Sequence, residues 1–120
     1  HARGGLSPAA LARVQVFVEA NLRRKLAIGA LAARAGLSPA HFTRSFRVTT
    51  GTTPRAFVEA RRVERARHLL LETARPLSSI ALECGFGTQS RLTTVFRRHT
   101  GSTPAVFRRG LRPQRSAAVD

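Results

Sequence analysis

The sequence is poor in the residues from which disulfide frameworks, metal sites and cofactor pockets are usually built. It holds one cysteine, Cys84, and no methionine, tryptophan or tyrosine among its 120 residues. A single cysteine excludes an internal disulfide and a cysteine-based zinc site, and it favours a reducing compartment. The four histidines are far apart, and no two have the i, i+4 spacing of a helical metal site. We therefore expect neither a metal nor a cofactor.

Acidic residues and long apolar runs are scarce as well. Six Asp and Glu stand against 21 Lys and Arg, which gives a net charge of +15. The few carboxylates form no paired constellation for acid–base work, and no serine lies in a nucleophile elbow, so we expect no enzyme. No apolar stretch approaches the length of a membrane span, and the leading HARGGLSP has no signal-peptide core. The expected location is cytoplasmic, on the nucleoid.

Arginine dominates what is present. Twenty of the 21 basic residues are Arg, whose planar fork suits bidentate contacts to phosphates and base edges. The hydrophobic share of 42% is too high for a basic disordered tail, so the chain has a folded core. The expected partner is a polyanion. The missing initial Met and the short lead indicate a fragment of a longer protein.

A repeat organises the chain. The segment LAARAGLSPAHFTRSFRVTTGTTPRAF (31–57) recurs as IALECGFGTQSRLTTVFRRHTGSTPAVF (80–107). The offset is 49 up to Gly85 and 50 from Leu92 onward, so one extra residue lies in the turn between them. Each copy predicts a short helix, a glycine turn and a longer helix, which are the parts of a helix-turn-helix. The fold class is therefore all-α, with about seven helices in two helix-turn-helix subdomains joined by a long linker helix.

Helix signals divide the chain further. Gly51-Thr52-Thr53-Pro54 and its copy at 101–104 combine a left-handed glycine, a threonine cap and a first-turn proline. Helices are predicted at 8–23, 54–73 and 104–110, besides those of the two copies. The predicted organisation is a disordered lead at 1–7, a first subdomain at 8–53, a linker helix at 54–73, a second subdomain at 74–111 and a tail at 112–120.

The second helix of each copy has one apolar face and one small, polar or basic face. Helical phase at ~100° per residue places Phe42, Ser45 and Phe46 inward in the first copy and Leu92, Val95 and Phe96 inward in the second. The outward residues are Ala40, Thr43, Arg44 and Arg47 in the first, and Ser90, Thr93, Thr94 and Arg97 in the second. Such a face suits contact with base edges in a major groove.

The predicted linker helix gives a length check. Twenty residues at ~1.5 Å each span about 30 Å, close to the ~34 Å of one DNA turn. This length predicts two recognition helices in successive major grooves. Because the copies run head to tail and differ on their outward faces, the site is expected to be bipartite and asymmetric, with half-sites about 10 bp apart.

These residues resemble a known family. The stretches ALAARAGLSPAHFTRSFRVTTGTTP and PLSSIALECGFGTQSRLTTVFRRHTGSTP, within a core from about 8 to 110, are similar to the DNA-binding domain of AraC/XylS-type transcriptional regulators. The resemblance implies sequence-specific binding of double-stranded DNA and regulation of transcription. It also implies a separate effector-binding or dimerisation domain outside this chain. RNA polymerase is a further expected partner.

The resemblance further implies particular contact residues. Base contacts are expected at Ala40, Thr43, Arg44, Gln89, Ser90, Arg91 and Thr94. Phosphate contacts are expected at Ser38, Arg47, Thr88, Arg97, Arg98 and His99, which position the domain without reading sequence. Members often have a large side chain where Ala40 stands and an Arg where Thr94 stands, so direct readout by the second helix is expected to depend more on Gln89 and Arg91.

Two other functions fit the charge. The first is a sequence-indifferent architectural DNA- or RNA-binding protein, for which charge alone suffices. The second is a module that docks an acidic protein partner. The seven Phe are expected in the core and not on a single-strand stacking platform. Cys84 is expected to be a small buried hydrophobe.

Overall fold

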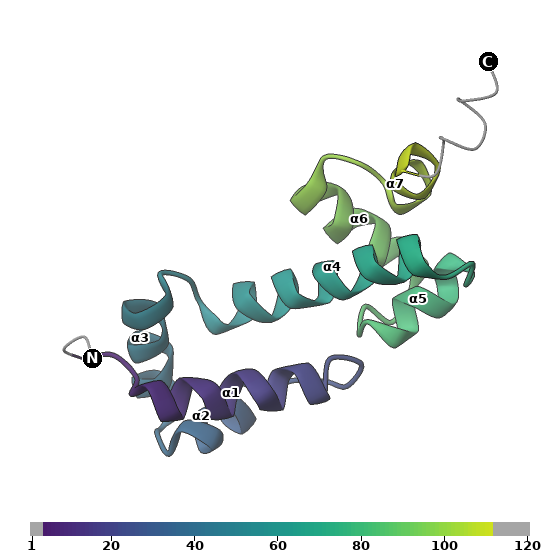
Figure 1. Cartoon of the computed structure of the whole chain (residues 1–120). Coiled ribbons are helices and arrows are strands. Elements are labelled where there is room, and N and C mark those ends of the chain that lie inside the picture. Colours follow the sequence, from purple (N-terminus) through teal and green to yellow (C-terminus); the bar gives the residue numbers. More distant parts are fainter. Residues whose placement is uncertain (1–3, 112–120) are drawn as a thin grey trace. The chain divides into compact units, whose positions relative to one another are not determined.

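The computed structural model describes residues 4–111, and every described element is a helix. In chain order the helices are α1 (Pro8–Ala20), α2 (Ile28–Ala35), α3 (Pro39–Thr50), α4 (Pro54–Glu72), α5 (Leu77–Glu83), α6 (Gln89–Thr100) and α7 (Pro104–Leu111) (Figure 1). The predicted all-α class with about seven helices is thus confirmed for this part of the chain. The predicted tail lies outside the described residues.

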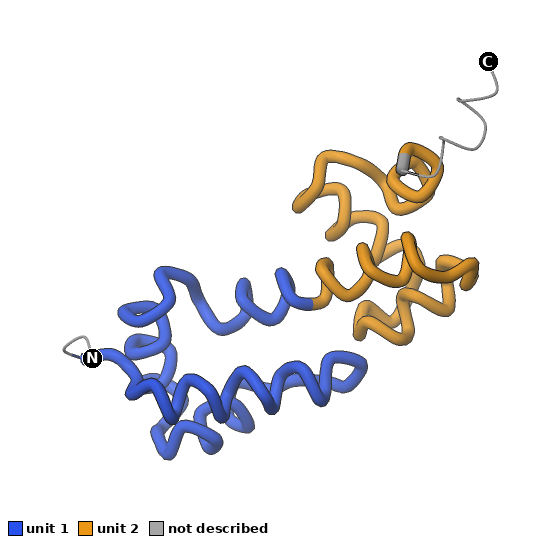
Figure 2. Tube along the Cα trace, viewed as in Figure 1, with its two compact units in different colours: residues 1–61 blue, residues 62–120 orange. Residues whose placement is uncertain are grey.

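The chain divides into two compact units, residues 1–61 and 62–120 (Figure 2). The boundary lies inside α4, the helix that we predicted as a separate linker. Its first turns bury Val58 in the core of the first unit, whereas Val63, Ala66 and Leu70 belong to the core of the second. Helix α4 therefore contributes buried residues to both cores, its first turns to the first core and its later turns to the second.

The core of the first unit collects one face from each of its helices. Helix α1 contributes Val14 and Val18, α2 contributes Leu31, and α3 contributes Phe42 and Phe46, all of which are fully buried. Phe46 also meets Phe57 of α4 edge to face, with ring centroids 5.4 Å apart. The inward face predicted for the second helix of this copy is confirmed, because Phe42, Ser45 and Phe46 are its buried residues.

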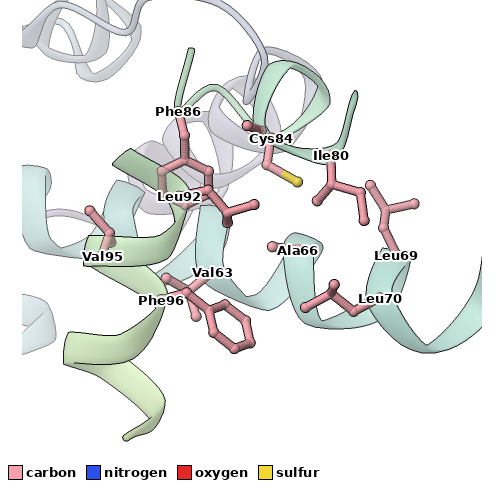
Figure 3. Packing of buried hydrophobic residues seen from close by; sticks show 11 residues of the cluster. Val63, Ala66, Leu69, Leu70, Ile80, Cys84, Phe86, Leu92, Val95 and Phe96 are labelled. Atoms are coloured by element: carbon pink, nitrogen blue, oxygen red, sulfur yellow. The ribbon is translucent and has the colours of Figure 1, made fainter. Parts of the chain in front are cut away.

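The core of the second unit repeats this arrangement (Figure 3). The buried residues of α6 are Leu92, Val95 and Phe96, which confirms the predicted inward face. Phe96 meets Phe107 of α7 edge to face at 5.3 Å, as Phe46 meets Phe57. The two predicted copies therefore build similar cores around an edge-to-face phenylalanine pair, and the first adds a tilted contact between Phe42 and Phe46 at 5.5 Å, where the second has Leu92.

The junctions that follow α3 and α6 are also alike. Gly51 and Gly101 end α3 and α6 in the left-handed conformation, with φ of 79° and 83°. The side-chain oxygen of Thr53 accepts from the Ala56 N–H at 3.1 Å, and that of Thr103 accepts from Val106 at 3.2 Å. Both predicted cap motifs are confirmed by these bonds, which set where the following helix begins.

Two expected boundaries differ in the structure. Helix α1 ends at Ala20 and not at residue 23, because the Asn21 side-chain amide donates to the Phe17 carbonyl at 2.8 Å and replaces the next helical turn. At the other end, residues 4–7 do not form a disordered lead. Leu6 is buried in the first core, its N–H donates to Thr49 Oγ1 at 2.7 Å, and Ser7 caps α1.

No helix described between residues 4 and 111 is both long enough and apolar enough to cross a membrane.

Candidate nucleic-acid interface

The first helix-turn-helix consists of α2, a short turn and α3. The turn depends on Gly36, whose φ of 73° lies in the left-handed region that favours glycine. The Leu37 N–H then returns to the Ala32 carbonyl at 3.0 Å, which closes the end of α2. Ser38 follows directly and caps α3, its oxygen accepting from the His41 N–H at 3.3 Å. The turn is thus held at both of its ends.

The second helix-turn-helix uses the same plan with a longer turn. Gly85 and Gly87 both have positive φ, 88° and 84°, and the N–H groups of Phe86 and Gly87 both reach the Ala81 carbonyl. Thr88 caps α6, its oxygen accepting from the Arg91 N–H at 3.1 Å. Gly87 is the extra residue that the repeat predicts, and it lies in the turn as expected.

Helix α3 presents the outward face predicted for it, with one exception. Ala40, Arg44 and Arg47 are exposed. Thr43 is only half-buried, and its hydroxyl donates to the Pro39 carbonyl at 2.9 Å. Thr43 can therefore offer a base its methyl group and an acceptor oxygen, but its one hydroxyl proton is already engaged.

Helix α6 presents more exposed positions than α3. Gln89, Ser90 and Arg91 of its first turn are exposed, and so is Thr94. Thr93, which we predicted on the outward face, is half-buried like its counterpart Thr43. The residues expected to contact bases therefore fall into two groups, one at the start of each long helix.

The residues expected to contact phosphate lie at the two ends of the same helices. Ser38 and Thr88 are exposed N-caps, and a capping hydroxyl that accepts from the backbone still has its own proton to donate. Arg47, Arg97, Arg98 and His99 are exposed in the last turns. A duplex lying along either helix would meet a hydroxyl at one end and a cation at the other.

One exposed residue escapes the sequence prediction. His41 is the counterpart of Arg91 at the offset of 50, and it lies exposed at the start of α3. Because His41 is neither small nor always charged, residue type alone did not single it out. The repeat offset was the signal that could have found it.

Helices α3 and α6 contain no carboxylate, and three glutamates of the described chain pair with arginines outside these two helices. Glu19 of α1 pairs with Arg61 of α4, and Glu64 lies 3.5 Å from Arg67. Glu83 of α5 lies 3.3 Å from Arg65 and 3.8 Å from Arg75. Neither α3 nor α6 contains an acidic residue. The positive charge of both presented faces is therefore not offset within its own helix.

Cys84 takes no part in this surface. It is fully buried beside Ile80 and Leu92 in the second core, as Figure 3 shows. Burial is the main reason why the pKa of the Cys84 thiol rises from 9.0 to about 11, although the Arg65 charge works against the rise. The thiol therefore stays neutral, as expected for a small buried hydrophobe.

Comparison with known proteins agrees with this geometry. Residues 31–110 match the family described as helix-turn-helix domain. The chain is 44% identical over 82 residues to the HTH-type transcriptional regulator Rv1931c of Mycobacterium tuberculosis, covering 68% of this chain and 32% of that protein. It spans about a third of the length of the curated relatives that it matches.

Two solved structures are also similar. The DNA-binding domain of the global transcriptional factor AdpA, solved with a target DNA, is 35% identical with a TM-score of 0.80, covering 90% of this chain and 99% of that one. An AraC-type regulator from Chromobacterium violaceum is 30% identical with a TM-score of 0.78, covering 89% and 92%. The chain therefore belongs to the helix-turn-helix DNA-binding domains of AraC-type transcriptional regulators.

Proposed function

We propose that this chain binds one asymmetric, two-part site on double-stranded DNA and thereby regulates transcription. The observation that carries the proposal is the repeated presentation of a capped helix. Helices α3 and α6 each bury an apolar face around a phenylalanine and expose a face of small, polar and basic residues with no carboxylate. The single helix α4, 19 residues long or about 28 Å at 1.5 Å per residue, is of suitable length to serve successive major grooves.

Arg44 is the proposed main reader of the first half-site. It is exposed, no carboxylate shares its helix, and Ala40 one turn before it leaves space for a close backbone approach. An Arg fork suits O6 and N7 of guanine. In α6 the equivalent position is Thr94, so we assign reading there to Gln89, Ser90 and Arg91 of the first turn.

The remaining basic residues position the domain. Arg47, Arg97, Arg98 and His99, with the caps Ser38 and Thr88, are proposed to contact phosphates. We further propose that the protein acts in the cytoplasm on the nucleoid, that it contacts RNA polymerase, and that an effector-binding or dimerisation domain completes it. Support for that last point comes from the relatives, which are about three times as long as the matched region.

Selection from random DNA tests the proposal directly. The chain should enrich a motif with two unlike halves whose centres lie about 10 bp apart. Affinity for that motif should fall by roughly 10³ to 10⁵ between 50 and 200 mM salt if 6 to 10 phosphates are contacted. A sequence-indifferent architectural protein would show the salt dependence without an enriched motif, and a module for an acidic protein partner would show neither.

A further inference from the structure

The outer face of α1 carries apolar side chains that the first core does not use. The inner face of the helix is already filled by Ala10, Val14 and Val18. On the opposite face Ala12, Val16 and Ala20 follow one another at i, i+4 and i+8, and all three are exposed, Val16 by 69%. A helix that is apolar on both faces is typical of one covered on both sides.

This outer face is hollowed where α1 meets the end of α2. The groove is open to solvent and has a volume of about 510 Å³, within the range of natural binding sites. Its lining residues are Ala12, Arg13, Val16, Phe17, Ala20, Asn21 and Arg34. The aliphatic and aromatic carbons of these side chains form its floor. The groove is therefore both concave and apolar, as a docking site for a protein segment needs to be.

Two arginines stand at one side of the groove in a defined arrangement. The guanidinium of Arg34 lies 4.3 Å from the centre of the Phe17 ring, and the Arg13 Nε donates to the Arg34 carbonyl at 2.9 Å. Within residues 4–111 neither arginine forms an ion pair. The carboxylate of Glu19, on the same helix, pairs with Arg61 instead. The groove thus combines an apolar floor with two cations that have no carboxylate partner in the described chain.

We infer that the groove between α1 and α2 docks an amphipathic helix of another protein, one that carries carboxylates beside its apolar face. A helix suits the floor because the i, i+4, i+8 row of small side chains accepts the ridges of a second helix at close range. Carboxylates suit the rim because Arg13 and Arg34 can bind them with paired hydrogen bonds. This surface is separate from the residues proposed to contact DNA.

Two other occupants fit less well. A second copy of the chain carries the same net charge of +15, and of its other exposed large apolar residues only Leu82 has an acidic residue within four positions of it in the sequence. That residue, Glu83, is already paired with Arg65 and Arg75. The DNA backbone would satisfy the two arginines but would leave the apolar floor facing charged phosphates. An acidic, apolar-faced helix matches both features at once.

Binding of designed peptides to the whole chain tests the inference. The probe is a labelled helical peptide of about 15 residues with leucines at i, i+4 and i+7 flanked by glutamates. Two controls replace either every glutamate by lysine or every leucine by serine. The glutamate peptide should bind, and each control should bind at least about tenfold more weakly. Amide NMR shifts on binding should concentrate on α1 and around Arg34.

Matched variants locate the site. Val16→Ser should weaken binding of the glutamate peptide about fivefold or more. Leu82→Ser, at a similarly exposed apolar position of α5, should leave that binding unchanged. Arg34→Gln should reduce the preference for glutamate over lysine, with Arg13 left to bind the carboxylates. Because Val16 is 69% exposed, Val16→Ser should retain the fold and its DNA affinity.

Three results would overturn the inference: no binding of the glutamate peptide, equal weakening by Val16→Ser and Leu82→Ser, or displacement of the peptide by duplex DNA. The last would assign the groove to the DNA surface. Self-association that depends on Val16 would assign it to a second copy. If DNA selection returned no motif while the glutamate peptide still bound, the proposed function would be rejected and the inference about the groove would stand.

Discussion

Phe46 and Phe96 occupy equivalent buried positions in the two units, whereas Arg44 and Thr94, two residues earlier in the same helices, differ in charge and length. Each phenylalanine is fully buried and meets a second ring edge to face at 5.3–5.4 Å. Arg44 is a long exposed cation, and Thr94 is a short exposed hydroxyl. The buried positions of the repeat thus keep one packing solution, while an exposed position gives each helix its own set of donors.

The turns of the two helix-turn-helix motifs also differ in backbone conformation. The first turn needs one left-handed glycine, Gly36, and the second needs two, Gly85 and Gly87. Both turns nevertheless deliver a capped helix, with Ser38 or Thr88 bonded to a backbone N–H three residues on. The extra residue therefore changes the backbone path into the helix and leaves the cap and the buried face of the helix unchanged.

The largest effect is expected from removing the buried phenylalanine at the equivalent position of each unit. Phe46→Ala and Phe96→Ala should each lower the unfolding free energy of the unit that contains them by about 3–5 kcal/mol, because each leaves a cavity beside its partner ring. Urea unfolding followed by amide hydrogen exchange in each unit measures this loss. If one of the two substitutions had an effect below about 1 kcal/mol, the equivalence of the two cores would be wrong.

Substitutions at Arg44 and Thr94 should change the affinity for DNA and not the free energy of unfolding. Arg44→Ala should weaken the selected DNA by about 1–3 kcal/mol and relax preference at one base pair, because a base-edge contact is lost. Thr94→Ala, at the equivalent position of α6, should have a smaller effect. Competition binding against single-base variants of the site measures both.

The matched control for Arg44 is a phosphate contact. Arg97→Ala should weaken binding to all DNA sequences alike and should lower the slope of log affinity against log salt concentration by about one. Should Arg44→Ala also weaken every sequence equally, the division between reading and positioning residues would fail.

The second turn can be tested by its added glycine. Gly87→Ala should lower the unfolding free energy of the second unit by about 1–2 kcal/mol, because a Cβ is strained at φ of 84° even though nothing lies within 4 Å of it. Gly29→Ala, in the first turns of α2 and equally open, should be neutral or slightly stabilising. Thermal unfolding of both variants measures the difference, and an equal effect would contradict the left-handed requirement.

The smallest effect at neutral pH is expected from the ionisation of Cys84, which aligns with half-buried Ala35 in the first unit. Its folded pKa of about 11 lies above the unfolded value of 9.0, so the unfolded thiol ionises first. The unfolding free energy should therefore be unaffected by this group below pH 9 and should fall as pH rises from 9 toward 11. Cys84→Ala should remove this part of the pH dependence. A slope unchanged in that variant would show that the thiol does not cause it.

Much of this fold follows from local signals in the sequence. The repeat, the left-handed glycines and the Thr-Pro caps predicted the helices and the inward faces of α3 and α6, because those features are set by backbone geometry and helical phase. The end of α1 at Ala20 was missed, since it depends on the Asn21 side chain taking over the Phe17 carbonyl. The buried Leu6 was missed because its partner Thr49 lies 43 residues away.

The candidate site was predictable to a similar depth. Helical phase predicted the exposed Ala40, Arg44, Ser90 and Thr94, but half-burial of Thr43 depends on its bond to Pro39 and on packing that phase does not show. Arg108 is a further example. Its guanidinium donates to the carbonyls of Leu70, Thr73 and Arg75 and so holds the end of α4. No sequence pattern distinguishes it from an arginine that would meet DNA.

If two similar cores present two unlike reading faces, the two halves of the DNA site cannot be exchanged. Affinity is measured for the selected site and for two symmetrised sites in which one half has been replaced by a copy of the other. Both symmetrised sites should bind at least about tenfold more weakly at the same salt concentration. Equal affinity for all three sites would show that the two faces do not read different sequences.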